Sequence, residues 1–132
     1  MDQSHNRETI LVVDDEAEVL ALLSHTLKAN GYTILEASSG GKALQICKQH
    51  TGEIHLIIAD VIMPGNLGGL ELLQRVVSLR PKIKRLCISG YVDEDMVRQA
   101  LPDSGTAFLQ KPFTTDDLLR NVRTLLDVAR QA

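Results

Sequence analysis

The segment Thr9-Ile-Leu-Val-Val-Asp-Asp-Glu16 decides the expected fold, because a short run of apolar and β-branched residues is followed at once by acids. Such a run is typical of a strand that is buried on both faces. The residues that follow place Val19, Leu23 and Leu27 at helical spacing, and Gly31 favours the end of a helix. The segment therefore predicts a strand, an acidic turn and an amphipathic helix.

The same alternation of strand-like and helix-like stretches continues along the chain. We expect further strands at 32–37, 55–59, 83–88 and 106–110, and helices at 16–30, 40–50, 69–79 and 114–129, with at best a short helix at 93–100. This order predicts an α/β fold, a three-layer, flavodoxin-like (βα)5 doubly wound parallel sheet with strand order 2-1-3-4-5. We expect one domain at 9–129, a flexible N-terminal tail at 1–8, a C-terminal tail at 130–132 and no attached output domain.

Composition excludes several classes of function. The net charge of −3 offers no general footprint for nucleic acid. No apolar run approaches the roughly 20 residues that span a bilayer, and the polar N-terminus has no signal-peptide segment. We therefore expect a cytoplasmic protein without membrane contact. Cys47 and Cys87 lie inside apolar segments and are expected to be reduced and buried, and the four histidines show no metal-ligand spacing.

Polar residues follow the expected strands at their carboxyl ends: Asp14 and Asp15, then Asp60, Ser89 and Lys111. In an open parallel sheet, these ends meet in one crevice. Carboxylates brought together there repel one another, and Mg²⁺ removes that cost while keeping positions for water and phosphate. A carboxylate such as Asp60 can form an aspartyl phosphate, and a lysine can neutralise phosphoryl oxygens.

Each of these residues also has an ordinary structural interpretation. The two acids after the first strand could stabilise the next helix N-terminus, and Asp60 could be a turn residue before Pro64. Ser89 before Gly90 could mark a loop, and Lys111 could be a surface lysine. Their joint occurrence at strand ends, with complementary chemistry, favours a phosphoryl-transfer site.

Four segments carry a resemblance that covers about residues 9–127. They are Ile10-Leu-Val-Val-Asp-Asp-Glu16, Leu56-Ile-Ile-Ala-Asp-Val-Ile-Met-Pro-Gly65, Ile88-Ser-Gly-Tyr91 and Phe108-Leu-Gln-Lys-Pro-Phe113. Together they resemble the receiver domain of response regulators in two-component signalling, the family of the chemotaxis response regulator.

The resemblance implies that Asp60 is the phosphoacceptor. It also implies a Mg²⁺ site, which Mn²⁺ could share, with Asp15, Asp60 and the backbone carbonyl of Ile62 as direct ligands. Asp14 would act through a bound water. The expected phosphoryl donor is a histidine kinase or a histidine phosphotransfer protein, so the isolated domain is a phosphoacceptor rather than an enzyme.

The resemblance further implies a switch. Ser89 would move to the phosphoryl group and Lys111 would pair with it, with a cis peptide bond before Pro112. Phe108 is the switch aromatic, whose rotamer follows Ser89, and Tyr91 is counted with the switch. A downstream protein would bind the face formed by the fourth helix, the fifth strand and the fifth helix, around Met96, Val97, Phe108 and the exposed side of 114–129.

The sequence departs from the family pattern in four places. The turn at 64–69 is one residue longer than usual, the fourth helix looks short before Pro102, and Phe108 replaces a frequent Tyr. Ile62 and Tyr91 are bulky at positions that tune the attack of water on the phosphate. These features resemble receivers at the C-terminus of hybrid sensor histidine kinases, and a stand-alone receiver is the other option.

Three rival functions remain for comparison. A haloacid-dehalogenase-type phosphatase would need a proton-transferring Asp two residues after the nucleophile, where this chain has Ile62. A flavin or nucleotide binder would offer amides rather than acids in its first turn. A phosphorylation-independent docking module on the receiver fold would keep the fold without using the chemical groups.

Overall fold

The computed structural model describes residues 8–60, 69–90 and 105–131. Its strands are β1 (Thr9–Val13), β2 (Thr33–Ala37), β3 (Leu56–Asp60), β4 (Lys84–Ser89) and β5 (Thr106–Gln110), and its helices are α1 (Ala17–Ala29), α2 (Gly40–Gln49), α3 (Gly69–Leu79) and α5 (Thr115–Gln131). These bounds agree with the sequence prediction to within two residues. The expected helix at 93–100 lies outside the described residues.

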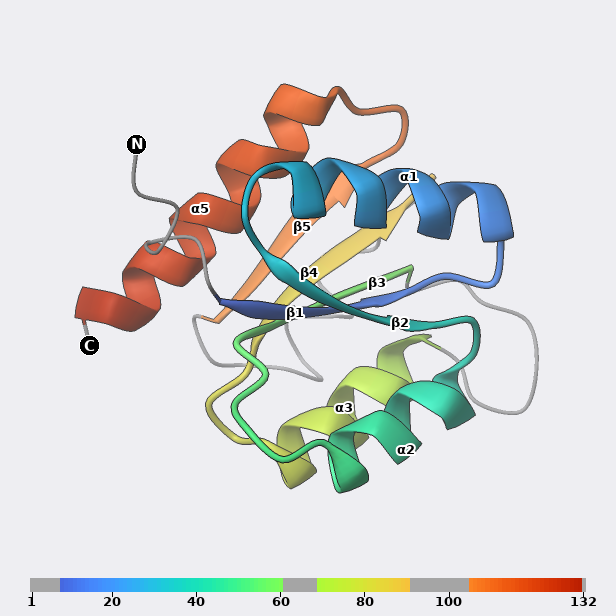
Figure 1. Ribbon diagram of the computed structural model, residues 1–132, viewed down its shortest axis with the longest axis vertical. Helices are drawn as coiled ribbons and strands as arrows, with labels where there is room; N and C mark the ends of the chain where they lie inside the picture. The colour runs from blue at the N-terminus through green and yellow to red at the C-terminus, as the bar shows by residue number, and fades with distance from the viewer. Residues whose placement is uncertain (1–7, 61–68, 91–104, 132) are drawn as a thin grey trace.

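The strands form one parallel sheet with the order β2-β1-β3-β4-β5. In Figure 1, α1 and α5 cover one face of the sheet, and α2 and α3 cover the other. This is the predicted three-layer, doubly wound arrangement. Parallel strands need this coverage on both faces, because each strand presents apolar side chains in both directions.

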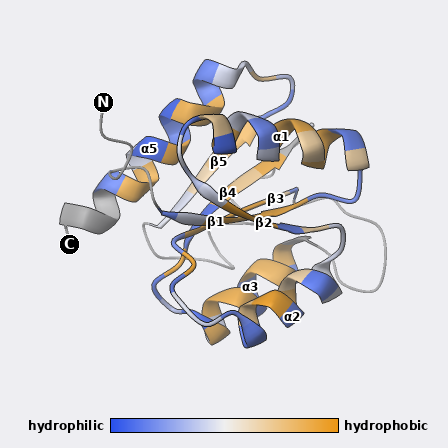
Figure 2. Ribbon diagram, in the orientation of Figure 1, coloured by the Kyte–Doolittle hydropathy of each residue, from blue (hydrophilic) through white to orange (hydrophobic). Residues whose placement is uncertain are grey.

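Two aliphatic clusters fill the spaces between the layers. The cluster under α1 and α5 includes Leu23, Leu27 and Val122, whereas the cluster under α2 and α3 includes Ala43 and Leu73. The central strand β3 is buried along its whole length, as the uninterrupted apolar run predicts. Figure 2 shows apolar residues on the strands and on the helices that pack against them.

Both cysteines are buried and form no disulfide, which agrees with the sequence prediction. Burial raises the pKa of the Cys87 thiol to about 12, although Arg85 opposes this shift. The pKa of Cys47 is also raised by burial. Both side chains therefore act as small apolar core groups.

The start of β1 is fastened to α5. Arg123 donates hydrogen bonds to Glu8 at 2.9 Å and to the Tyr32 hydroxyl at 3.1 Å, and it pairs with Asp127 at 3.0 Å. Glu8, which the sequence assigns to the tail, is therefore buried against α5. None of the described helices has the length and apolar character needed to cross a membrane.

The connection after α2 is held by Arg80, the residue that follows α3. Its guanidinium donates to the carbonyl oxygens of Cys47 at 3.0 Å, His50 at 2.7 Å and Gly52 at 2.8 Å. These carbonyls belong to the end of α2 and the loop beyond it, where few backbone partners exist. One side chain therefore joins α3 to the segment that leads into β3.

We predict that Arg80→Ala lowers the free energy of unfolding by about 2–3 kcal/mol, since it leaves three carbonyls without their charged donor. Urea denaturation would measure the change. Arg75→Ala is the matched control, because Arg75 makes an exposed ion pair with Glu71 within α3. That control should cost no more than about 0.5 kcal/mol, and an equal loss in the two variants would contradict the role of Arg80.

Candidate functional site

Strand pairing places three of the expected site residues at the carboxyl edge of the sheet. Val13 of β1 lies in register with Ala59 of β3, so the residues that follow them, Asp14 and Asp60, are level with each other. Lys111 follows the last residue of β5, two strands beyond β3 in the sheet. The sheet topology thus brings together side chains that are far apart in the sequence.

An ion pair joins Lys111 to Asp60. The lysine Nζ lies 3.1 Å from Asp60 Oδ2, and the Asp60 residue is only 6% exposed. Burial lowers the pKa of Lys111, but the hydrogen bond that it donates to Asp60 and the charges of Asp60, Asp14 and Glu16 outweigh burial and raise that pKa overall. Lys111 therefore remains a cation beside the Asp60 carboxylate.

The backbone next to this pair has the expected form, because the Lys111–Pro112 peptide bond is cis. A second carboxylate is near the ammonium, because Glu16 Oε1 lies 3.9 Å from Lys111 Nζ. Glu16 was not among the predicted site residues, although it is the third acid of the segment after β1. Its position in that acidic run is the signal that could have identified it.

Asp14 is completely buried beside this pair. Its Oδ1 accepts a hydrogen bond from the Glu16 backbone N–H at 2.9 Å, whereas its buried Oδ2 has no hydrogen-bond partner. Burial raises the pKa of Asp14. The Glu16 hydrogen bond and the Lys111 charge oppose this shift, and the Asp60 and Asp15 carboxylates add to it. The surrounding hydrogen bond and positive charge therefore do not fully offset the cost of burying the ionised Asp14 carboxylate.

The structure places the remaining site residues less completely. Asp15 is exposed, and its charge acts on Asp14. Ser89 ends β4 and lies in register with Gln110, but its side chain is outside the description. Phe108 is half-buried and packs against the cluster beneath α2 and α3. Ile62, Tyr91, Met96, Val97 and the long turn at 64–68 lie outside the described residues.

The described acidic, histidine and cysteine side chains do not gather in groups of three or more that could hold a metal ion. Of the three carboxylates expected in this crevice, Asp14 and Asp60 are buried and Asp15 is exposed. Two carboxylates with water and a backbone oxygen are still a suitable donor set for Mg²⁺. The unpartnered Asp14 oxygen also fits a water bound to such a cation.

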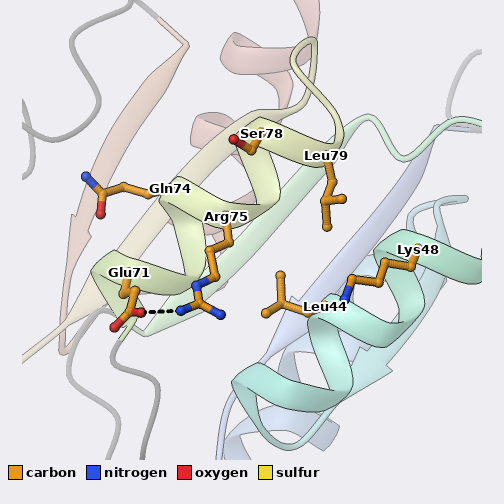
Figure 3. Close-up of a pocket in the computed structure, with 7 residues that line it drawn as sticks. All are labelled: Leu44, Lys48, Glu71, Gln74, Arg75, Ser78 and Leu79. Atoms are coloured by element: carbon orange, nitrogen blue, oxygen red, sulfur yellow. Dashed lines mark hydrogen bonds and ion pairs between the residues drawn. The ribbon is translucent and has the colours of Figure 1, made fainter.

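A separate hollow lies between α2 and α3, with a volume of about 540 Å³. Figure 3 shows Leu44 of α2 and Leu79 of α3 facing each other across it, with the Glu71–Arg75 ion pair on one wall. None of the predicted site residues that the structure describes lines this hollow.

Comparison with known proteins agrees with this geometry. Residues 10–123 match the family model described as the response regulator receiver domain. The chain is 35% identical over 119 residues to sensor kinase CckA of Brucella abortus (strain 2308), which covers 90% of this chain and 12% of that protein. It is 28% identical to sporulation initiation phosphotransferase F of Bacillus subtilis (strain 168), with 90% of this chain and 94% of that protein covered.

Solved structures show the same likeness. The receiver domain of the hybrid histidine kinase CckA is 36% identical, with a TM-score of 0.76 and coverage of 89% of this chain and 98% of that one. A CheY-like receiver domain protein of Methanospirillum hungatei JF-1 is 27% identical, with a TM-score of 0.84 and coverage of 95% and 98%.

The chain spans 12% of CckA and 24% of the transport regulator DctD of Rhizobium meliloti (strain 1021), so these matches concern one domain of larger proteins. The family model covers most of the chain. The fold of the chain is also that of the receiver structures to which it is similar. The chain therefore belongs to the response regulator receiver domain family of two-component systems.

Proposed function

We propose that Asp60 accepts a phosphoryl group from the phosphohistidine of a histidine kinase or a histidine phosphotransfer protein. The observation that carries this proposal is the ion pair between Lys111 and the buried Asp60, at 3.1 Å, beside the buried Asp14. This arrangement supplies a carboxylate nucleophile and a fixed positive charge at one point of the sheet edge.

In the proposed reaction, a carboxylate oxygen of Asp60 forms a bond to phosphorus while the bond between phosphorus and the donor nitrogen breaks. Such transfers depend mainly on positioning and on neutralising the charge of the phosphoryl oxygens. Lys111 is already held at the acceptor carboxylate, so its ammonium is placed to pair with the incoming oxygens. The product is an aspartyl phosphate.

The same site fits a divalent cation, Mg²⁺ or Mn²⁺. Asp15, Asp60 and the Ile62 carbonyl would hold it, and Asp14 would contact it through water. The fit rests on the buried Asp14 oxygen that lacks a partner and on the raised pKa of this carboxyl. A hard cation would supply the positive charge that the cluster of acids needs at the moment the phosphoryl group arrives.

The proposed output is a change in partner binding. Ser89 and Lys111 would contact the phosphoryl group, Phe108 would repack against its half-buried surroundings, and Tyr91 would respond with them. A downstream protein would then bind the face formed by the expected helix at 93–100, β5 and α5. Phosphorylation shifts this binding only by as much as the contacts of the two states differ.

The CckA likeness supports an origin in a hybrid sensor histidine kinase. In this arrangement, we propose that the receiver works in the cytoplasm and exchanges phosphoryl groups with a phosphotransfer histidine. The alternative arrangement is a stand-alone receiver, for which the likeness to the Bacillus phosphotransferase is the support. In either arrangement, the isolated chain is a phosphoacceptor, and its partners are proteins rather than nucleic acid or membrane.

We predict that incubation with acetyl phosphate and Mg²⁺ adds one phosphoryl group to the intact protein, as measured by mass spectrometry. Asp60→Asn should abolish this gain, because an amide is not a competent nucleophile for phosphoryl transfer. Asp116→Asn, a change at an exposed acid in the first turn of α5, should leave it intact. No gain by the unaltered chain, with or without Mg²⁺, would instead support a phosphorylation-independent docking module.

We also predict that Asp14→Asn stabilises the metal-free protein at pH 7, by about 1–2 kcal/mol, because it removes a buried charge with one unpartnered oxygen. The folded protein raises the pKa of Asp14, so folding is penalised wherever Asp14 is ionised. As the pH falls through that raised pKa, Asp14 takes up a proton and the difference between the proteins should narrow. Saturating Mg²⁺ at pH 7 should narrow it as well.

Urea denaturation at several pH values measures this difference. Asp15→Asn is the control, since Asp15 is exposed and its removal should stabilise the protein less. A metal-free Asp14→Asn protein that is less stable than the original at pH 7 would show that the charge is well compensated, against this account of the site.

A further inference from the structure

The carboxyl ends of β4 and β5 are joined by a side chain that the reaction itself does not use. Gln110 ends β5 and lies in register with Ser89, which ends β4. The Gln110 side-chain amide reaches across and donates a hydrogen bond to the backbone carbonyl of Gly90 at 3.3 Å. Gln110 directly precedes Lys111 in the sequence. It also contacts Gly90, which directly follows Ser89.

Among the described residues, packing around Gly90 is sparse. Gly90 is exposed, and no described atom lies within 4 Å of the position that a Cβ would occupy there. In contrast, the preceding β4 residues Leu86, Cys87 and Ile88 are completely buried. In the described part of the chain, the hydrogen bond from the Gln110 side chain is thus what holds the backbone at Gly90, where the chain leaves β4.

We propose that Gln110 is a positioning residue that restrains the Ser89–Gly90 segment in the unphosphorylated protein. The proposal rests on the proposed function, in which Ser89 moves to the phosphoryl group on Asp60. A contact that favours the resting arrangement lowers the fraction of molecules that are ready to hold a phosphoryl group. The apparent affinity for such a group falls by the same fraction.

The direction of the effect follows from the state that the structure represents. The Gln110 bond is present while Lys111 is paired with the unmodified Asp60. In the proposed switch, the movement of Ser89 toward Asp60 breaks this bond, so its loss by mutation would remove stabilisation from the resting state. A neutral, exposed hydrogen bond of this length contributes only modestly to the free energy of the resting state. Its loss should therefore strengthen binding of a phosphoryl mimic by about two- to five-fold.

The test compares the dissociation constant for beryllofluoride, a phosphoryl mimic, in the presence of Mg²⁺, followed by fluorine NMR. Gln110→Met keeps the length of the side chain and its neutral charge but removes the amide donor. Gln74→Met is the matched control, because Gln74 is an exposed glutamine on α3 that lines the hollow between α2 and α3 (Figure 3). The urea midpoint of each variant is measured in parallel.

The proposal expects Gln110→Met to bind beryllofluoride two- to five-fold more tightly, with a urea midpoint lowered by no more than the matching loss of resting-state stability, while Gln74→Met matches the unaltered protein in both measurements. A purely structural role would lower stability without tightening binding. Equal or weaker binding by Gln110→Met would overturn the proposal. If the proposed function itself is wrong, the unaltered chain will bind no beryllofluoride. In that case the proposed role of Gln110 is rejected as well.

Discussion

The parallel pairing of β1 with β3 is the constraint on which the site depends. Its register sets Val13 opposite Ala59, and the next residue of each strand is an aspartate. Because both strands are buried on both sides, a slip by one residue would disrupt the packing of both apolar clusters and draw the aspartate at a strand end toward the core. The sheet therefore forces Asp14 and Asp60 together at its carboxyl edge, and the order of strands brings β5 and Lys111 to the same edge.

This placement carries an electrostatic cost that the rest of the fold must offset. Asp14 is fully buried with one unpartnered oxygen, which is an unfavourable arrangement in a resting protein. Lys111 balances part of the negative charge through Asp60. The fold gains stability elsewhere from the packing of its two apolar clusters. Long-range ion pairs such as that between Arg123 and Glu8 add to it. A locally unfavourable arrangement such as this buried, partly unpaired carboxylate is typical of functional sites in folds that are otherwise well packed.

The sequence predicted the sheet well because apolar runs and helical spacing are local signals, and β3, α3 and the strand order follow from them. The residues at strand ends were predictable for the same reason. Arg80, Arg123 and Gln110 were not, because their partners are set by how distant segments pack: Arg80 binds carbonyls at Cys47, His50 and Gly52, and Gln110 binds the neighbouring strand's exit. No pattern within a short window reports such contacts.

The most direct test of the account is the position of the phosphoryl group. Borohydride reduction of the phosphorylated protein converts an aspartyl phosphate into homoserine, which peptide mapping by tandem mass spectrometry locates. The ion pair of Asp60 with Lys111 predicts homoserine at position 60 and at no other aspartate. Homoserine at Asp14 or Asp15 instead, or a stable phosphoryl group on another type of side chain, would contradict the account.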